Sequence, residues 1–100
     1  MDPTNQELTY MPNYILLDDR LSMGAKLAWQ IFAMQQNSEN DIHNLDVVAQ
    51  ILDKHIETIR KYILELVEFN YLNRTPKNNG EFGYIYSIPE EHIPVKKTSL

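Results

Sequence analysis

The sequence predicts a mainly helical α+β fold in which three helices precede a C-terminal two-stranded β-hairpin. Three observations predict it. Apolar residues recur at helical spacing in three separate stretches before residue 70. A polar break, Asp53-Lys54, separates the second stretch from the third. Asn79-Gly80, a dipeptide typical of tight turns, then lies between two strand-like runs.

The composition predicts one small domain. The chain has 100 residues, and 43% hydrophobic residues suffice for a modest core. With no Cys there are neither disulfides nor thiolate metal sites. No apolar run approaches the roughly 20 residues of a membrane span, and "MDPTNQELTY" lacks the features of a signal peptide. We expect a soluble, cytoplasmic protein with a flexible arm over residues 1–10, a folded domain over 11–89 and a flexible tail over 90–100.

The charge is unevenly distributed. The net charge is −5, which for the whole molecule disfavours nonspecific binding to nucleic acid. Residues 1–52 carry seven acids and two bases, which accounts for the whole excess, and residues 53–83 carry five of each. The second half of the chain is therefore free to present a locally basic face.

The first helix is expected from Met23 to Gln35, with Ser22 as its N-cap. Before it, "MPNYILL" predicts a short strand or extended arm. The apolar positions of the helix are Ala25, Leu27, Ala28, Trp29, Ile31, Phe32 and Met34. Its only solvated stripe is expected to be Lys26, Gln30, Ala33 and Asn37. A helix that is apolar on most sides is expected to lie at the centre of the fold.

The second and third helices are short and long respectively. Asn44 is the expected cap of the second, with Asp46 in its first turn. Its apolar positions are Leu45, Val48, Ala49 and Leu52. The pattern resumes at Ile56 on a new phase, with a buried side formed by Ile59, Tyr62, Ile63, Leu66 and Phe69. The outward side is Glu57, Arg60, Lys61, Leu64 and Glu68. Two helices joined by so few residues must cross steeply, as in a helix-turn-helix, and Asn70 can end the second.

The C-terminal part predicts the hairpin. Phe82, Tyr84, Tyr86 and Ile88 alternate as in a half-buried strand, and Pro89 ends the ladder. A hairpin after a helix-turn-helix is the winged-helix arrangement.

The sequence also resembles a known group of proteins. "LSMGAKL" and "TIRKYILELVEFNYL" are similar to motifs of the winged-helix DNA-binding proteins of bacterial plasmids and phages, especially Gram-positive ones. These comprise N-terminal domains of replication initiators, small transcriptional regulators and accessory proteins that bind transfer origins. The resemblance covers roughly residues 10–88. It implies the fold and a DNA-binding role, and it is less specific for the biological process.

One departure from that pattern bears on binding. The family often has a small residue and then Ser, Thr or Lys where this chain has Asp53, His55 and Glu57. An acid at the start of the recognition helix weakens the approach of a phosphate there.

The candidate DNA-binding residues lie in the turn, the third helix and the hairpin: Lys54, His55, Glu57, Thr58, Arg60, Lys61, Arg74, Lys77, Asn78 and Asn79. Arg60 and Lys61 can reach guanine edges or phosphates in a major groove, or they form an ordinary solvated face. Thr58 bonds a phosphate or supports the helix start. Glu57 accepts from a cytosine amino group, or, as we favour, interacts with the helix dipole.

The hairpin offers a second set of contacts. Arg74 suits a narrow minor groove, and the amides of "KNNGE" suit base edges, although that stretch is also good turn chemistry. The wing therefore contributes as much readout as the third helix in our interpretation. We interpret Tyr10, Tyr14, Trp29, Phe32 and Tyr71 as core or seam residues rather than stacking platforms.

No pattern indicates catalysis or a cofactor. His43, His55 and His92 lack the spacing of metal ligands, and Asp18-Asp19 is interpreted as solvated rather than as an acid/base pair. The three glycines form no phosphate-binding loop. An enzyme is not expected.

The sequence therefore predicts a sequence-specific double-stranded DNA-binding protein of a mobile element. It would act at a replication origin, a transfer origin or an operator, as a dimer or as pairs on repeated half-sites. The alternative is a winged-helix module that binds another protein in a replication or transfer complex, which the acidic first half favours.

Overall fold

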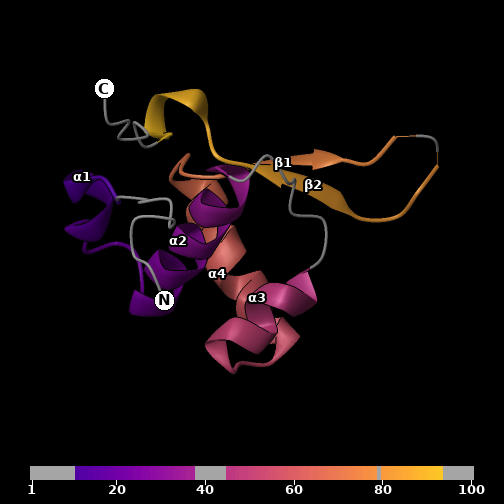
Figure 1. Cartoon of the computed structure of the whole chain (residues 1–100), viewed down its shortest axis with the longest axis horizontal. Helices are drawn as coiled ribbons and strands as arrows, with labels where there is room; N and C mark the ends of the chain where they lie inside the picture. Colours follow the sequence, from indigo (N-terminus) through magenta and orange to yellow (C-terminus); the bar gives the residue numbers. More distant parts are fainter. Residues whose placement is uncertain (1–10, 38–44, 79, 94–100) are drawn as a thin grey trace, which may run out of the picture.

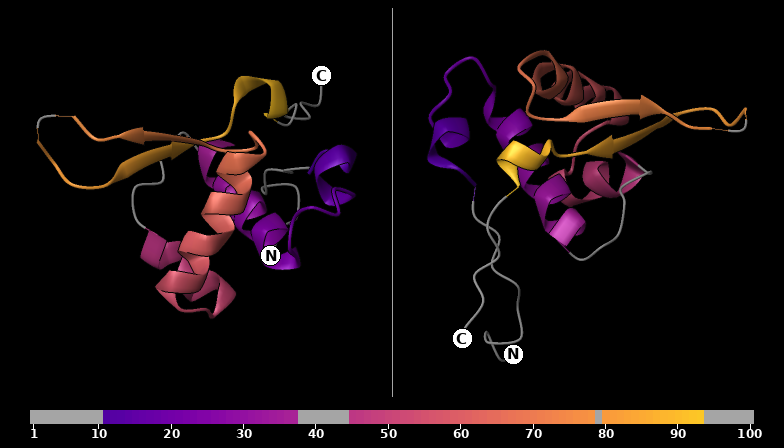
Figure 2. Two further views of the ribbon diagram at one scale, coloured as in Figure 1. Left: turned by 180° about the vertical axis from the view of Figure 1, so that it is seen from behind. Right: turned by 90° about the horizontal axis from the view of Figure 1, so that it is seen from above.

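The computed structural model describes residues 11–37, 45–78 and 80–93 (Figure 1). The element order is α1, α2, α3, α4, β1, β2 and the 3-10 turn η2. Three main helices followed by an antiparallel two-stranded hairpin confirm the predicted fold class and are consistent with winged-helix topology. The hairpin projects from the helices, and α1 lies at the opposite end of the long axis (Figures 1 and 2).

The segment expected to be a strand is a one-turn helix, α1 (Asn13–Leu16). Pro12 precedes it with φ −57°, and its carbonyl accepts from the N–H groups of Ile15 and Leu16 at 3.0 and 3.1 Å. The turn inserts Ile15 fully into the core. The prediction of a strand was wrong. Ile15 is the only buried residue of α1, and one helical turn suffices to bring it into the core.

The central helix α2 (Met23–Asn37) begins as predicted at Ser22. The Ser22 hydroxyl oxygen accepts from the Ala25 N–H at 3.2 Å, as an N-cap does. The carboxylate of Glu65, from α4, accepts from both the Ser22 N–H at 2.7 Å and the Ser22 hydroxyl at 2.8 Å. This negative charge at the positive end of α2 joins the two helices.

The buried face of α2 is rotated from the one expected. Its buried residues are Ala25, Ala28, Trp29, Ile31, Phe32 and Ala33. Ala33 was expected in solvent, whereas Leu27 and Met34 were expected in the core and are exposed. The prediction was wrong because apolar residues surround most of this helix, so the sequence did not define which side its neighbours cover.

Helices α2 and α4 approach closely at Gly24. A Cβ added at Gly24 would overlap the ring of Tyr62. We expect Gly24→Ala to lower the free energy of unfolding by about 1–2 kcal/mol through overpacking. In a Tyr62→Ala background the same change should instead stabilise by up to about 1 kcal/mol, because Ala is the better helix former. Urea unfolding of the four proteins measures the cycle, and equal effects in both backgrounds would contradict the contact.

The predicted helix-turn-helix consists of α3 (Leu45–Leu52), a turn and α4 (Ile56–Glu68). Asp53 adopts a left-handed φ of 54°, its N–H donates to Gln50 O at 3.2 Å, and the Lys54 N–H donates to Ala49 O at 3.0 Å. These two bonds are the Schellman end of α3. The expected cap Asn44 lies outside the described residues. The helix is therefore interrupted at Asp53-Lys54, as predicted.

Helix α4 has the two faces expected of it. The residues predicted to face inward, namely Ile59, Tyr62, Ile63, Leu66 and Phe69, are buried or half-buried, and those predicted to face outward are all exposed. Asn70 ends the helix in the left-handed region at φ 62°. The Tyr71 N–H then donates to Leu66 O at 2.8 Å, which repeats the ending of α3.

The hairpin pairs β1 (Asn73–Pro76) with β2 (Tyr84–Ser87). Asn73 lies opposite Ser87, and Pro76 lies opposite Tyr84. The alternation predicted for Phe82, Tyr84, Tyr86 and Ile88 is correct for Tyr86 and Ile88, which are buried, but Tyr84 is 40% exposed and Phe82 is 97% exposed. The pattern fails there because Gly83, with a φ of 105°, interrupts the strand before it reaches Phe82.

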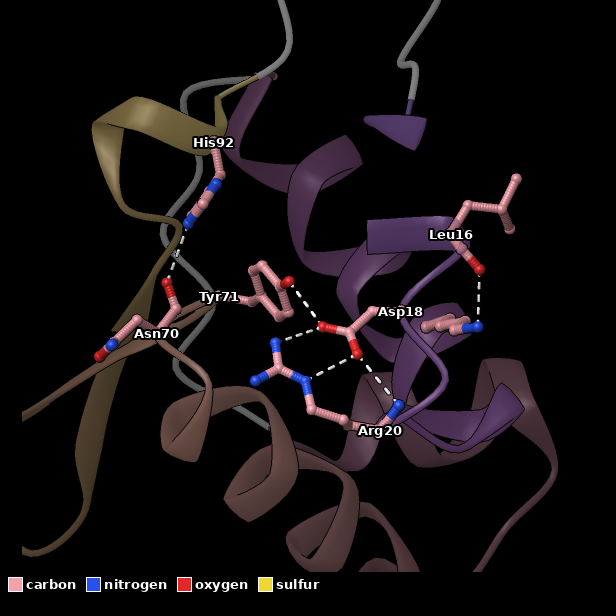
Figure 3. A network of polar contacts seen from close by, with 7 residues as sticks. Leu16, Asp18, Arg20, Asn70, Tyr71 and His92 are labelled. Atoms are coloured by element: carbon pink, nitrogen blue, oxygen red, sulfur yellow. Dashed lines mark hydrogen bonds and ion pairs between the residues drawn. The ribbon is translucent and has the colours of Figure 1, made fainter. Parts of the chain in front are cut away.

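The residues after the hairpin are ordered further than expected. Pro89 ends the strand as predicted, but η2 (Glu90–His92) follows where a flexible tail was expected. The His92 Nε2 lies 3.0 Å from Asn70 O (Figure 3), and its Nδ1 lies 2.6 Å from the Tyr14 hydroxyl. His92 thus connects α1 to the end of α4, so the folded unit extends beyond residue 89.

Asp18 is not solvated as expected, because its side chain is only 7% exposed. One oxygen accepts from Arg20 Nη2 at 2.6 Å and from the Tyr71 hydroxyl at 2.7 Å, and the other accepts from Arg20 Nε at 2.9 Å (Figure 3). The bonds from Arg20, and next the bond from Tyr71, hold the pKa of Asp18 well below its usual range. Asp18 joins the α1–α2 connection to Tyr71, and the prediction failed because Tyr71 is distant in sequence.

Asp18 makes stability depend on pH in a definite direction. Its pKa is lowered on folding, so its stabilisation is present above the unfolded value of about 3.9 and is lost as the pH falls towards the lowered folded pKa. We expect Asp18→Asn to be less stable than the parent at pH 7, with the difference shrinking below about pH 4. Urea unfolding at stepped pH measures this. An unchanged difference at low pH would contradict it.

None of the helices in the described parts of the chain combines the length and apolarity needed to cross a membrane.

Candidate nucleic-acid interface

The exposed face of α4 presents the residues that the sequence predicts. Glu57, Arg60, Lys61 and Leu64 are all exposed there, and Thr58 is half-buried. Because Ile59, Ile63 and Leu66 fix the opposite face in the core, the orientation of the outward face is set by packing.

The positive charges on this face differ in their availability. Arg60 forms an ion pair with Glu57, three residues earlier on the same helix. Lys54 and Lys61 are exposed and make no ion pair with any residue in the described ranges. Glu57 therefore offsets one guanidinium, while the two ammonium groups have no carboxylate partner in the ranges that the structure describes. Surface pairs of this kind contribute little to stability and can be exchanged at low cost.

The start of α4 lacks a side-chain cap. His55 occupies the N-cap position with φ −65° and makes no capping hydrogen bond through its side chain. Its carbonyl accepts from the N–H groups of Thr58 and Ile59 at 2.9 and 3.2 Å. Glu57 lies in the first turn, where its charge is favourable to the helix dipole. This position supports the structural interpretation of Glu57 over a base contact.

The hairpin has two distinct faces. Arg74 lies opposite Tyr86 and diagonal to Tyr84, so these three side chains share one face. The Arg74 guanidinium lies 4.7 Å from the centre of the Tyr84 ring. Tyr86 packs against Phe32 with ring centres 5.8 Å apart, which fixes this face against α2.

The hairpin loop carries the remaining candidates. The Lys77 N–H donates to Gly83 O at 3.1 Å, and the Glu81 N–H donates to Asn78 O at 3.4 Å. Gly80, the described residue of the predicted turn, therefore lies beyond the paired strands, between these two hydrogen bonds. Asn78 is exposed and Lys77 is half-buried. Asn79 lies outside the described residues, so its predicted role stays a prediction.

Helix α4 and the hairpin enclose an open groove of about 370 Å³. Arg60 and Leu64 line it from α4, and Arg74 and Tyr84 line it from the strands. Ile63 and Tyr86, both buried, form its floor. The structure therefore brings Arg60 and Arg74 to one groove. The groove does not include Lys54, His55 and Thr58, which lie at the start of α4.

Of the described residues that line the groove, only Arg60 and Arg74 were predicted site residues, and Leu45, Ile63, Leu64, Gly83, Tyr84 and Tyr86 were not. Tyr84 was assigned only to strand alternation, and Leu45 only to the core of the second helix, yet both line the groove. The only signal in the sequence was that Tyr84 is an aromatic residue two positions before Tyr86, on the same face of the expected strand. Its role could not be derived, because the hairpin register decides which residues it faces.

The described residues contain no group of three or more His, Asp or Glu side chains that could hold a metal ion. His92 has the structural role described above, and His55 lies in the turn between α3 and α4.

No family model, curated protein or solved structure matches this chain. The fold and the geometry of α4 and the hairpin are therefore the basis for assigning a function.

Proposed function

We propose that this protein binds double-stranded DNA sequence-specifically through α4 and the hairpin. It would act at an origin of replication or transfer, or at an operator, of a mobile element such as a Gram-positive plasmid or phage. The observation that supports this most is the pair of adjoining exposed elements that carry Lys54, Lys61, Arg74 and Lys77 without a carboxylate partner among the described residues.

The proposal gives the two elements different tasks. A helix of 13 residues that projects one face, as α4 does, has the shape that enters a major groove. There Lys61 lies in the middle of the exposed face and would contact bases or phosphates. The projecting hairpin would reach the adjacent backbone or minor groove through Lys77 and Asn78. Phosphate contacts position the protein, and few base contacts suffice for specificity.

The net charge of −5 is compatible with this proposal. The excess of acids lies in residues 1–52. Among the described acids of that stretch, Asp18 and Asp19 follow α1, which lies at the far end of the molecule from the hairpin (Figure 1), whereas Asp46 lies on α3. Acidic residues at the α1 end would orient the molecule towards DNA and weaken nonspecific binding in other orientations. Such a protein would bind a specific site better than bulk DNA.

The test is a titration of fluorescently labelled duplexes that tile the DNA upstream of its gene, repeated over a salt series. We expect one duplex to bind more tightly than its scrambled counterpart. Its log affinity should fall linearly with log salt, by about 0.9 for each phosphate contacted. Equal binding to all duplexes, or an affinity independent of salt, would contradict the proposal. Neighbouring relaxase, replicase or repressor genes would distinguish the three processes.

A second candidate function is a winged-helix module that binds another protein. The observation that favours it is the apolar surface of α2 and the α1–α2 connection, where Leu17 is 76% and Met23 68% exposed. Leu27 and Met34 continue this surface along α2. Exposed apolar residues that recur on one side of a helix are typical of a protein contact, including contact with a second copy. An apolar interface would respond little to salt, which distinguishes it from DNA binding.

A further inference from the structure

The groove between α4 and the hairpin has a character different from a phosphate-binding surface. Ile63 and Tyr86 close its floor, and Leu64 and Tyr84 form its walls. Leu64 is 54% exposed although it faces this hollow. A DNA backbone is hydrated and gains little from an apolar floor, whereas an apolar side chain gains from leaving water.

Two guanidinium groups flank this apolar floor. Arg60 lies on the helix side and Arg74 on the strand side, and no carboxylate is among the described residues that line the groove. Both guanidinium groups act on the Tyr86 hydroxyl at the floor. Burial raises the pKa of this hydroxyl, and the positive charges of Arg74 and Arg60 oppose that rise. The rim therefore carries a free guanidinium on the strand side and, on the helix side, a guanidinium that pairs with Glu57 outside the groove.

The Arg74 guanidinium is held in an orientation that suits a carboxylate ligand. Its guanidinium stacks over the Tyr84 ring at 4.7 Å and makes no hydrogen bond or ion pair within the described part of the chain. Stacking holds the planar group in place while its N–H donors remain free at the edge, and a planar fork of donors matches a carboxylate.

We propose that this groove binds a short acidic peptide segment that inserts one aromatic or aliphatic side chain between α4 and the hairpin. The volume of about 370 Å³ is near the lower limit for a ligand site, so it suits one anchoring side chain rather than a folded surface. An acidic residue on one side of that anchor pairs with Arg74, and one on the other side pairs with Arg60 in exchange for Glu57, a surface pair that contributes little to stability. Charge complementarity thus identifies the partner as an acidic segment of a protein.

This inference goes beyond the proposed DNA-binding function and does not depend on it, because it assigns a different ligand. The two ligands would share Arg74, so an acidic segment that occupies the groove would compete with DNA. A partner protein could then release the protein from its site.

The test uses the full chain labelled with ¹⁵N and, as probe, a short peptide with one phenylalanine between pairs of glutamates. We expect the amides of Leu64, Gly83 and Tyr84 to shift together with a Kd tighter than about 1 mM. A peptide with glutamines in place of glutamates should bind about tenfold more weakly, because the charge-assisted bonds are lost. A peptide with glycine in place of phenylalanine should weaken similarly.

Two protein variants test the residues themselves. Arg74→Gln and Leu64→Gln should each weaken the peptide about tenfold. The matched control is Leu16→Gln, which changes a leucine of similar exposure (49%) on α1, the element at the other end of the molecule, and should leave the Kd unchanged. Retained dispersion in the amide spectrum confirms that each variant folds.

Three results would overturn the inference. If the peptide shifts no amide signals, or only signals outside α4 and the hairpin, the groove is not the peptide site. Equal binding by the glutamine peptide would show that the glutamates do not pair with the arginines of the groove. If duplex DNA shifts the groove amides and the acidic peptide does not, the groove belongs to the DNA surface, and the proposed function stands while this inference fails. If the peptide binds in the groove and no duplex binds, this inference stands and the proposed function fails.

Discussion

Reversing two charges, Lys61→Glu together with Lys77→Glu, is expected to lower the affinity for the target duplex by about 100-fold at roughly 0.1 M salt. The two lysines lie on α4 and at the base of the hairpin loop, and neither forms an ion pair within the described residues. Each change removes one phosphate contact and adds repulsion. The slope of log affinity against log salt should become shallower by about two, which a salt series measures.

A matched pair of single variants controls for net charge. Lys61→Gln and Asn13→Glu each lower the net charge by one unit, but Asn13 is exposed on α1, away from the hairpin (Figure 1). Only Lys61→Gln should weaken binding and flatten the salt slope. Equal losses for the two would mean that overall charge, rather than this face, governs DNA affinity.

Replacing Trp29 by Ala is expected to have the largest effect on stability, about 3–5 kcal/mol. Trp29 is fully buried, and its indole N–H donates to Tyr71 O at 3.0 Å. The substitution leaves both a cavity and an unpaired carbonyl. Small domains have about 5–15 kcal/mol of total stability, so the variant should be partly or wholly unfolded. Circular dichroism and urea unfolding measure this.

The companion variant is Met23→Ala, on the exposed side of the same helix. It should change the free energy of unfolding by less than about 0.5 kcal/mol. A large loss for Met23→Ala would show that its surface is covered in solution. A small loss for Trp29→Ala would contradict the core described above.

The elements that the sequence predicted correctly are those with local causes. The break at Asp53-Lys54 is visible because the apolar phase changes there, and the structure places a left-handed residue at that point. Ser22 and Asn70 act through their own side-chain and backbone preferences. Gly80 adopts the positive φ that a turn dipeptide predicts, and this preference belongs to the glycine itself. Each of these signals extends over a few residues.

The errors concern contacts between distant parts of the chain. Which side of α2 is buried depends on where α4 and the hairpin pack, and composition alone made several sides equivalent. Asp18 was assigned to solvent because its partner Tyr71 is 53 residues away. The role of Glu65 at the start of α2 was missed for the same reason, since Ser22 is 43 residues away.

The candidate site shows the same division. The exposed face of α4 followed from its periodicity, so Arg60, Lys61 and Leu64 were placed correctly in solvent. That Arg60 and Arg74 line one groove depends on the hairpin register and on how β2 packs against α2 through Tyr86. Neither fact is encoded within a short window of sequence. The DNA-binding assignment of these residues itself stays a prediction.

The bond between Tyr14 and His92 has a practical consequence for engineering. It joins α1 to η2 at 2.6 Å, so the first and last elements of the fold meet away from the projecting hairpin (Figure 1). A short flexible linker could therefore connect residue 93 to residue 11, and new ends could be opened elsewhere in a circularly permuted chain. Surface tethers or reporter domains attached on this side would leave α4 and the strands unobstructed.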